Sequence, residues 1–113
     1  MNDWIKDAPV AVTVCDRDGK ITEMNGKACG VFEKYGGKAL IGSDLLACHP
    51  EPARTKLKEW LSGDAPVVNA YTIEKNGVKK LIYQFSLVRD GRPAGLVELS
   101  LELPPDMQHF VRK

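Results

Sequence analysis

The apolar residues of this chain change their spacing twice, and that change limits the folds that the chain can adopt. A period of two places alternate side chains on opposite faces of a strand. It holds over five segments, residues 10–15, 20–24, 67–75, 78–88 and 95–102. In the middle, apolar residues fall three and four positions apart from Asn25 to Gly36 and again over residues 51–62, which indicates helices. The order of two strands, short helices and three strands predicts an α+β domain.

Turn signals between these segments indicate antiparallel pairing. Asn76-Gly77 separates two of the predicted strands and is typical of a type I′ hairpin. Gly19 ends the predicted turn Asp16–Gly19, and Asn25 is a suitable cap for the first helix. We therefore expect a five-stranded antiparallel sheet whose last three strands form a meander, with the short helices packed on one face.

Composition places the chain among ordinary globular proteins and gives no sign of a charged partner. Sixteen basic and fifteen acidic side chains leave a net charge of +1, so we expect neither nucleic acid nor an anionic membrane as partner. Residues 1–9 lack the apolar core of a secretory signal, and no apolar run reaches the roughly 20 residues that span a bilayer. The irregular spacing of Cys15, Cys29 and Cys48 favours reduced thiols in a cytoplasmic protein.

The order and spacing of several short motifs resemble the PAS domain family. The matching residues are Ala8-Pro9, Asp16-Arg17-Asp18-Gly19-Lys20-Ile21, Asn25, Leu40-Ile41-Gly42, His49-Pro50 and Gly95-Leu96-Val97. The resemblance covers residues 8–102 and implies a five-stranded antiparallel sheet with helices wrapped on one face. It also implies a sensory role, with a small molecule or cofactor held between sheet and helices, and frequent pairing into homodimers.

Three parts of the chain are expected on this basis. Residues 1–9 form an N-terminal segment suited to a dimerisation helix, residues 10–103 form the PAS domain, and residues 104–113 form a C-terminal tail. Trp4 and Ile5 would make the dimer contact, although Trp4 could instead fold back over the outer face of the sheet. The sequence leaves open whether the domain is a stand-alone sensor or a fragment of a longer signalling protein.

Strand alternation and the helical faces together predict a pocket. On the last strand, Val97, Leu99 and Leu101 are expected to point inward, and the residues expected to point outward are Glu98, Ser100 and Glu102. The candidate lining residues of a mostly apolar, small-molecule pocket are His49, Trp60, Tyr71, Tyr83 and Phe85. The alternative is that these side chains pack to native density and leave no cavity.

His49 precedes the second helix and is a candidate cofactor ligand. A helix N-terminus disfavours a cation, so this histidine is expected in the neutral form that can ligate iron. The resemblance implies that haem-binding PAS domains take their axial histidine from this region. The alternative, which we favour, is that His49 hydrogen-bonds a loop carbonyl or caps the helix. Only Cys48 matches the reactive segment of the light-sensing subfamily, so a covalent flavin adduct is not supported, and no close cysteine pair suggests zinc.

The sequence thus predicts a sensory domain that binds a small molecule or cofactor and relays its occupancy to a signalling partner or through dimerisation. It contains no phosphate-binding loop, His-Glu-x-x-His motif or nucleophile elbow, so no enzymatic activity is expected. Two alternatives stay open. One is a ligand-free interaction and dimerisation module, and the other is a haem-based gas or redox sensor that uses His49.

Overall fold

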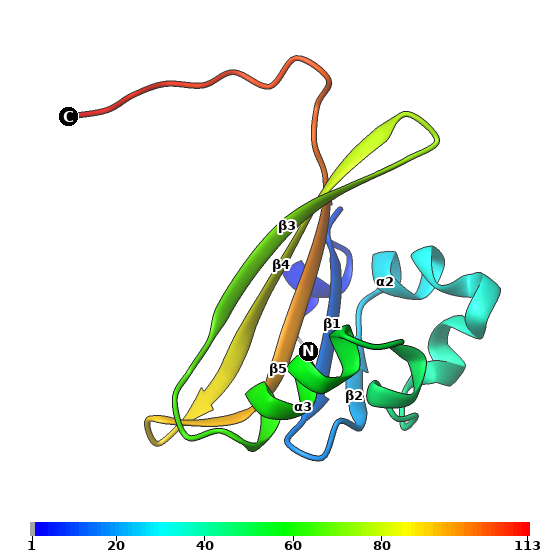
Figure 1. Cartoon of the computed structure of the whole chain (residues 1–113). Helices are drawn as coiled ribbons and strands as arrows, with labels where there is room; N and C mark the ends of the chain where they lie inside the picture. Colours follow the sequence, from blue (N-terminus) through cyan, green and yellow to red (C-terminus); the bar gives the residue numbers. More distant parts are fainter. Residues whose placement is uncertain (1) are drawn as a thin grey trace.

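The computed structural model describes residues 2–113, and Met1 of the predicted N-terminal segment and the side chain of Cys48 lie outside this description. A single five-stranded antiparallel sheet has the order β2-β1-β5-β4-β3 (Figure 1). Its strands are β1 (Ala11–Asp16), β2 (Ile21–Met24), β3 (Val68–Lys75), β4 (Val78–Arg89) and β5 (Arg92–Glu102). The predicted α+β fold with a C-terminal meander is confirmed.

Short helices connect β2 to β3 and lie on one side of the sheet, while a further short helix precedes β1 (Figure 1). The α-helices are α1 (Asp3–Lys6), α2 (Gly26–Val31) and α3 (Ala53–Ser62), and the 3₁₀ helices are η1 (Glu33–Tyr35), η2 (Gly37–Leu40) and η3 (Leu46–Cys48). No helix in residues 2–113 is long and apolar enough to cross a membrane.

The helix predicted from Asn25 to Gly36 is shorter than its apolar pattern suggested. Its α-helical part ends at Val31, and the chain continues as the separate 3₁₀ turn η1. Gly30 and the β-branched Val31 are poor helix formers, which explains why the helix stops there. Gly36 then adopts a φ of +119°, so the glycine ends η1 as expected.

Two hairpin turns shape the meander. Asn76 and Gly77 have φ angles of +53° and +78°, the conformation that a type I′ turn requires. Asp90 and Gly91, with +52° and +76°, make a second turn of the same kind between β4 and β5. The register of β4 and β5 then shifts between Leu87 and Val88, which marks a β-bulge next to this turn.

Apolar residues are buried on both faces of the sheet. On the face toward the helices, Cys15 of β1 and Leu96 of β5 pack against Leu57 and Leu61 of α3. A neighbouring cluster on the same face joins Ala11, Ile21, Met24 and Ala28, with α2 and η2 around it. On the opposite face, Val12, Val14 and Val97 form a third cluster, against which Ile5 of α1 packs.

The expected direction of the last strand is wrong. Leu96 meets α3, so the alternate residue Glu98 lies on the helix-facing side together with Ser100 and Glu102. Val97 and Leu99 point to the opposite face, where they pack near α1 rather than under the middle helices. The alternation itself was predicted correctly. The face was not, because the pattern alone does not say which apolar set the helices cover.

Asn25 joins the two sides of the domain through a buried side chain that is 1% exposed. Its Oδ1 accepts hydrogen bonds from the backbone N–H groups of Val12 (2.9 Å) and Ala28 (3.0 Å), so it caps α2 as predicted. Its Nδ2 donates to the carbonyl oxygens of Ile5 (2.8 Å) and Val10 (2.7 Å). One amide therefore fixes α1, the entry to β1 and the start of α2 relative to one another.

Arg17 fastens the end of α3 to the sheet. Its Nη1 donates to the carbonyl oxygen of Pro93 in β5 at 3.0 Å, and its Nη2 donates to that of Ser62 at 3.1 Å. The last carbonyls of a helix carry partial negative charge, so a guanidinium is favourable there. The contact holds α3 against the helix-facing side of β5.

Replacing Asn25 with alanine should lower the free energy of unfolding by about 3 kcal/mol, because two buried N–H groups and two carbonyls lose their partner together. Asn2→Ala is the matched control, since Asn2 precedes α1 without a side-chain capping bond, and it should change stability by less than about 0.5 kcal/mol. Urea denaturation followed by circular dichroism measures both. Equal losses in the two variants would contradict the role given to Asn25.

Candidate ligand-binding site

A row of polar side chains crosses four strands on the helix-facing side of the sheet. Asn69 of β3 lies opposite Gln84 of β4, Gln84 lies opposite Glu98 of β5, and Glu98 lies opposite Thr13 of β1. Directly opposed residues in antiparallel strands share a face and are within side-chain contact. We call Asn69, Gln84, Glu98 and Thr13 the polar row.

Three members of the polar row are linked by hydrogen bonds that run in one direction. Asn69 Nδ2 donates to Gln84 Oε1 at 3.0 Å, and Gln84 Nε2 donates to Glu98 Oε2 at 2.9 Å. The middle residue is only 5% exposed, and the bonds at both of its ends fix the orientation of its amide. The chain ends on the Glu98 carboxylate, which is partly exposed.

Burial raises the pKa of Tyr71, and the negative charge of Glu98 on the same face raises it further. Tyr71 lies opposite Ile82, one step along the face from Gln84. Its phenol therefore stays neutral at physiological pH and offers a hydroxyl and a ring on the same sheet face as the Glu98 carboxylate.

Cys15 lies on this face as well, and it is not a reactive thiol. Burial raises its pKa to about 11, and the carboxylates of Asp16 and Glu98 act in the same direction, while a backbone hydrogen bond at Leu96 opposes them. A redox-sensing cysteine needs a lowered pKa and access to solvent, and Cys15 has neither. It serves as a core residue.

His49 follows η3 on the helical side of the domain and is held by the backbone. Its Nδ1 lies 2.8 Å from the carbonyl oxygen of Leu45, so this nitrogen is the donor, and Arg54 Nε donates to the His49 carbonyl oxygen at 3.0 Å. This contact is the loop-carbonyl bond that we favoured from the sequence. A ring that donates from Nδ1 has Nε2 as the nitrogen that could bind a metal, the arrangement that backbone carbonyls give to metal-binding histidines.

The structure separates the five residues predicted to line one pocket. Tyr71 lies on the helix-facing side, and Trp60 packs beside the Leu57–Leu96 cluster on that side. Tyr83 and Phe85 point to the opposite face, with their ring centroids 6.1 Å apart. They cannot share a pocket with Trp60, because a whole sheet lies between. Tyr83 and Phe85 are the sequence neighbours of Gln84 in β4, so their side chains point to the face opposite that of Gln84.

The polar row was not predicted, because the expected pocket was mostly apolar and its expected lining contained neither amides nor a carboxylate. Part of the signal was available: a two-residue turn at Asn76-Gly77 places residue 69 opposite residue 84. Two amides at facing strand positions indicate a hydrogen-bonded pair. Glu98 was harder to place, because the bulge shifts β5 by one position and a regular hairpin would pair Gln84 with Val97 instead.

This sheet face does not fit a haem. Haem is a large, flat and mostly apolar group, and the central strands would oppose it with a carboxylate and two amides. His49 has a suitable free nitrogen, but the facing wall is wrong for the macrocycle. Among the described residues, no group of three or more His, Cys, Asp and Glu side chains could hold a metal ion.

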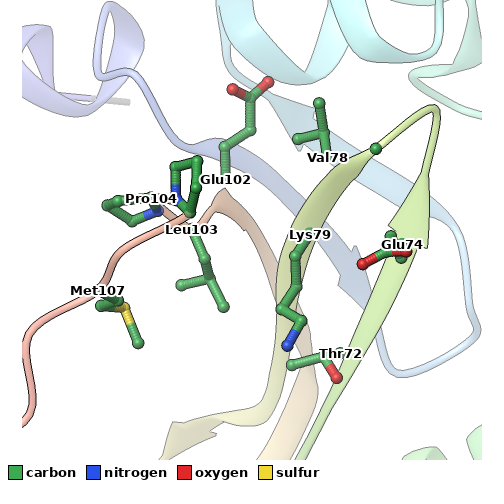
Figure 2. A pocket seen from close by; sticks show the side chains of 10 residues that line it. Thr72, Glu74, Val78, Lys79, Glu102, Leu103, Pro104 and Met107 are labelled. Carbon is green, nitrogen blue, oxygen red and sulfur yellow. The ribbon is translucent and has the colours of Figure 1, made fainter.

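A hollow of about 960 Å³ lies elsewhere, at the tip of the β3–β4 hairpin (Figure 2). Its walls come from the hairpin and from the chain that follows β5, with Lys79 and Thr72 on one side and Leu103 and Met107 on the other. It is widely open to solvent. None of the five predicted pocket residues lines it, and it contains no member of the polar row.

Comparison with known families and structures gives one consistent result. A family model described as the PAS fold matches residues 5–103. No curated protein matches the sequence. Among solved structures, the photoactive yellow protein domain of the sensor histidine kinase Ppr from Rhodospirillum centenum is 17% identical, with a TM-score of 0.62 over 88% of this chain and 92% of that one.

Two further structures are similar. The Aer2 receptor from Vibrio cholerae, described as a dual PAS-heme oxygen sensor, is 12% identical, with a TM-score of 0.61 over 84% of this chain and 95% of that one. The sensor region of a sensor histidine kinase is 19% identical, with a TM-score of 0.60 over 81% of this chain. The present chain spans only 38% of that region. At these identities the likeness concerns the fold.

Replacing Glu98 with glutamine should lower the pKa of Tyr71 but leave it above the usual tyrosine value, because burial, the larger cause, is unchanged. Glu74→Gln removes the same charge from the other face of β3 and should leave the Tyr71 titration where it is. Titration of the Tyr71 ¹³Cζ resonance, assigned with Tyr71→Phe, measures the change. An unshifted titration in Glu98→Gln would show that the two side chains do not face one another.

Proposed function

Because this chain belongs to the PAS domain family, we propose that it is a sensory signalling domain that binds a small molecule on the helix-facing side of its sheet. The family model, which matches residues 5–103, supports the sensory role. The observation that carries the ligand proposal is the polar row, in which Gln84 is buried and oriented at both ends. Fixed polar groups beside an apolar core are typical of ligand sites.

The proposed ligand lies between the polar row and the segment from η3 to α3. His49 and Trp60 belong to that segment, and Tyr71 contributes from the sheet. Of the five residues predicted from the sequence, these three stay in the proposed site. The domain performs no chemistry of its own in this proposal, and a cytoplasmic location agrees with it.

Ligand occupancy would act by a shift between packing arrangements of α3 on the sheet. The helix is held by the cluster of Leu57, Leu61, Cys15 and Leu96 and by the Arg17 contacts at its C-terminal end. A ligand that contacts both α3 and β5 stabilises the arrangement that it fits, and a partner that distinguishes the arrangements receives the signal.

The opposite face of the sheet is proposed as the surface through which two copies associate. On that face Tyr83 is 37% exposed, and Phe85 and Leu99 are partly covered. Trp4 of the adjacent α1 is 72% exposed. Exposed apolar side chains on one face of a domain favour association. This observation also favours the second candidate function, a dimerisation module without a ligand.

A panel of metabolites tested by differential scanning fluorimetry should contain a compound that raises the melting temperature of the wild-type protein. Gln84→Leu should lose that rise, because both hydrogen bonds of the polar row disappear. Gln108→Leu, in the exposed tail, should keep it. A compound that stabilises the wild type and Gln84→Leu equally would place the ligand elsewhere. If no compound has an effect, the ligand-binding function is contradicted.

Association of the domain should be lost in Tyr83→Lys, which places a charge in the middle of the apolar face. Tyr71→Lys puts the same residue on the other side of the sheet and should associate as the wild type does. Trp4→Ala should weaken association if α1 takes part. Sedimentation velocity over a range of concentrations measures all four proteins. A monomeric wild type, or a Tyr83→Lys dimer, would overturn the proposed surface.

A further inference from the structure

The polar row ends on a negative charge that its neighbours do not balance. The residues directly opposite Glu98 are the neutral Thr13 and Gln84, and the residues on either side along the same face of β5 are Leu96 and Ser100. The hydrogen bond from Gln84 is donated by a neutral amide. A partly buried carboxylate in such surroundings attracts a cationic group.

We propose that Glu98 and the ring of Tyr71 recognise a protonated amine on the ligand, so that the domain senses a small organic cation. This inference rests on the proposed function and specifies its ligand class. A carboxylate and an aromatic ring on the same sheet face can offer an ammonium group both a charge-assisted hydrogen bond and a cation–π contact.

The hydrogen-bond chain determines which atom of Glu98 meets the ligand. Asn69 donates to Gln84 Oε1, so the Gln84 amide must present its NH₂ to Glu98 Oε2 and cannot turn to offer an acceptor. Oε1 is therefore the oxygen that we assign to the amine. Gln84 is buried and Glu98 is partly exposed, and the bond from Gln84 orients the carboxylate through its Oε2 atom.

Tyr71 suits the same cation. Its side chain is 46% exposed on the helix-facing side, so its ring is accessible from the proposed site. The raised pKa keeps its hydroxyl protonated, and the phenol then adds no second negative charge.

The charges on this face also exclude other ligand classes. The next charged residues along it, Lys80 and Glu102, lie opposite one another and form a cross-strand pair of opposite sign. Glu98 is therefore the unbalanced charge of the sheet at the polar row, and it repels carboxylates and phosphates. The Glu98 carboxylate attracts the protonated amine and repels anions, and both effects contribute to the specificity of the site.

Three probes of one shape test the charge preference: benzylamine, which is protonated at neutral pH, benzyl alcohol and benzoate. In ¹⁵N-HSQC titrations of the whole chain, benzylamine should shift the amides of residues 69, 84 and 98 in a saturable way. Benzyl alcohol should bind about tenfold more weakly and benzoate should not bind there, because only the ammonium gains the ionic hydrogen bond. Equal shifts with benzyl alcohol, or no shifts with benzylamine, would overturn the proposal.

Variants distinguish a failure of the amine-binding inference from a failure of the proposed ligand-binding function. Glu98→Gln should weaken benzylamine binding about tenfold, while Glu74→Gln on the opposite face should leave it unchanged. Tyr71→Leu, at a half-exposed position, should weaken it about threefold through the lost cation–π contact and gives a second test if Glu98→Gln unfolds. If a neutral or anionic metabolite from the panel binds at the polar row and Glu98→Gln has no effect, the cation inference fails and the sensory ligand site stands.

Discussion

The four hydrogen bonds of Asn25 hold together parts of the chain that no continuous element joins. The side chain follows β2 directly. It binds the backbone of α1 at Ile5 and the start of β1 at Val10 and Val12, and it caps α2. A buried amide without these hydrogen bonds would cost free energy. The Asn25 side chain therefore stabilises the native position of α1 and the native start of α2 together. The apolar cluster under α1 and the cluster under α2 depend on this one residue.

A second constraint brings the central strands close enough to align the polar row. A Cβ atom on Gly95 would lie 2.1 Å from the carbonyl oxygen of Cys15, so only glycine allows β5 to approach β1 there. The adjacent bulge gives β5 one extra residue before it resumes pairing with β4. Glu98 meets Gln84 on one side and Thr13 on the other as a result of both features.

The two faces of the sheet therefore differ in chemistry: one carries the polar row and the other is apolar. Gln84 lies in the polar row on the helix-facing side, while its sequence neighbours Tyr83 and Phe85 belong to the apolar face behind it. In the proposed sensor, ligand and partner surface are thus separated by the thickness of one strand. A ligand that repositions β4 or β5 alters both faces at once, because residues adjacent in a strand cannot move independently.

The sequence by itself determined the elements: the period of two located five strands, Asn76-Gly77 marked the hairpin, and Asn25 was recognised as a helix cap. It also gave reasons to doubt a cofactor role for His49. It could not decide which face of β4 and β5 the helices cover, because each strand carries apolar residues on both faces. Local alternation is set by neighbouring residues, whereas the covered face depends on the contact of Leu96 with Leu57, distant in sequence, and on the bulge at Leu87/Val88. Only the tertiary structure therefore moved Tyr83 and Phe85 out of the predicted pocket and brought Glu98 into line with Gln84.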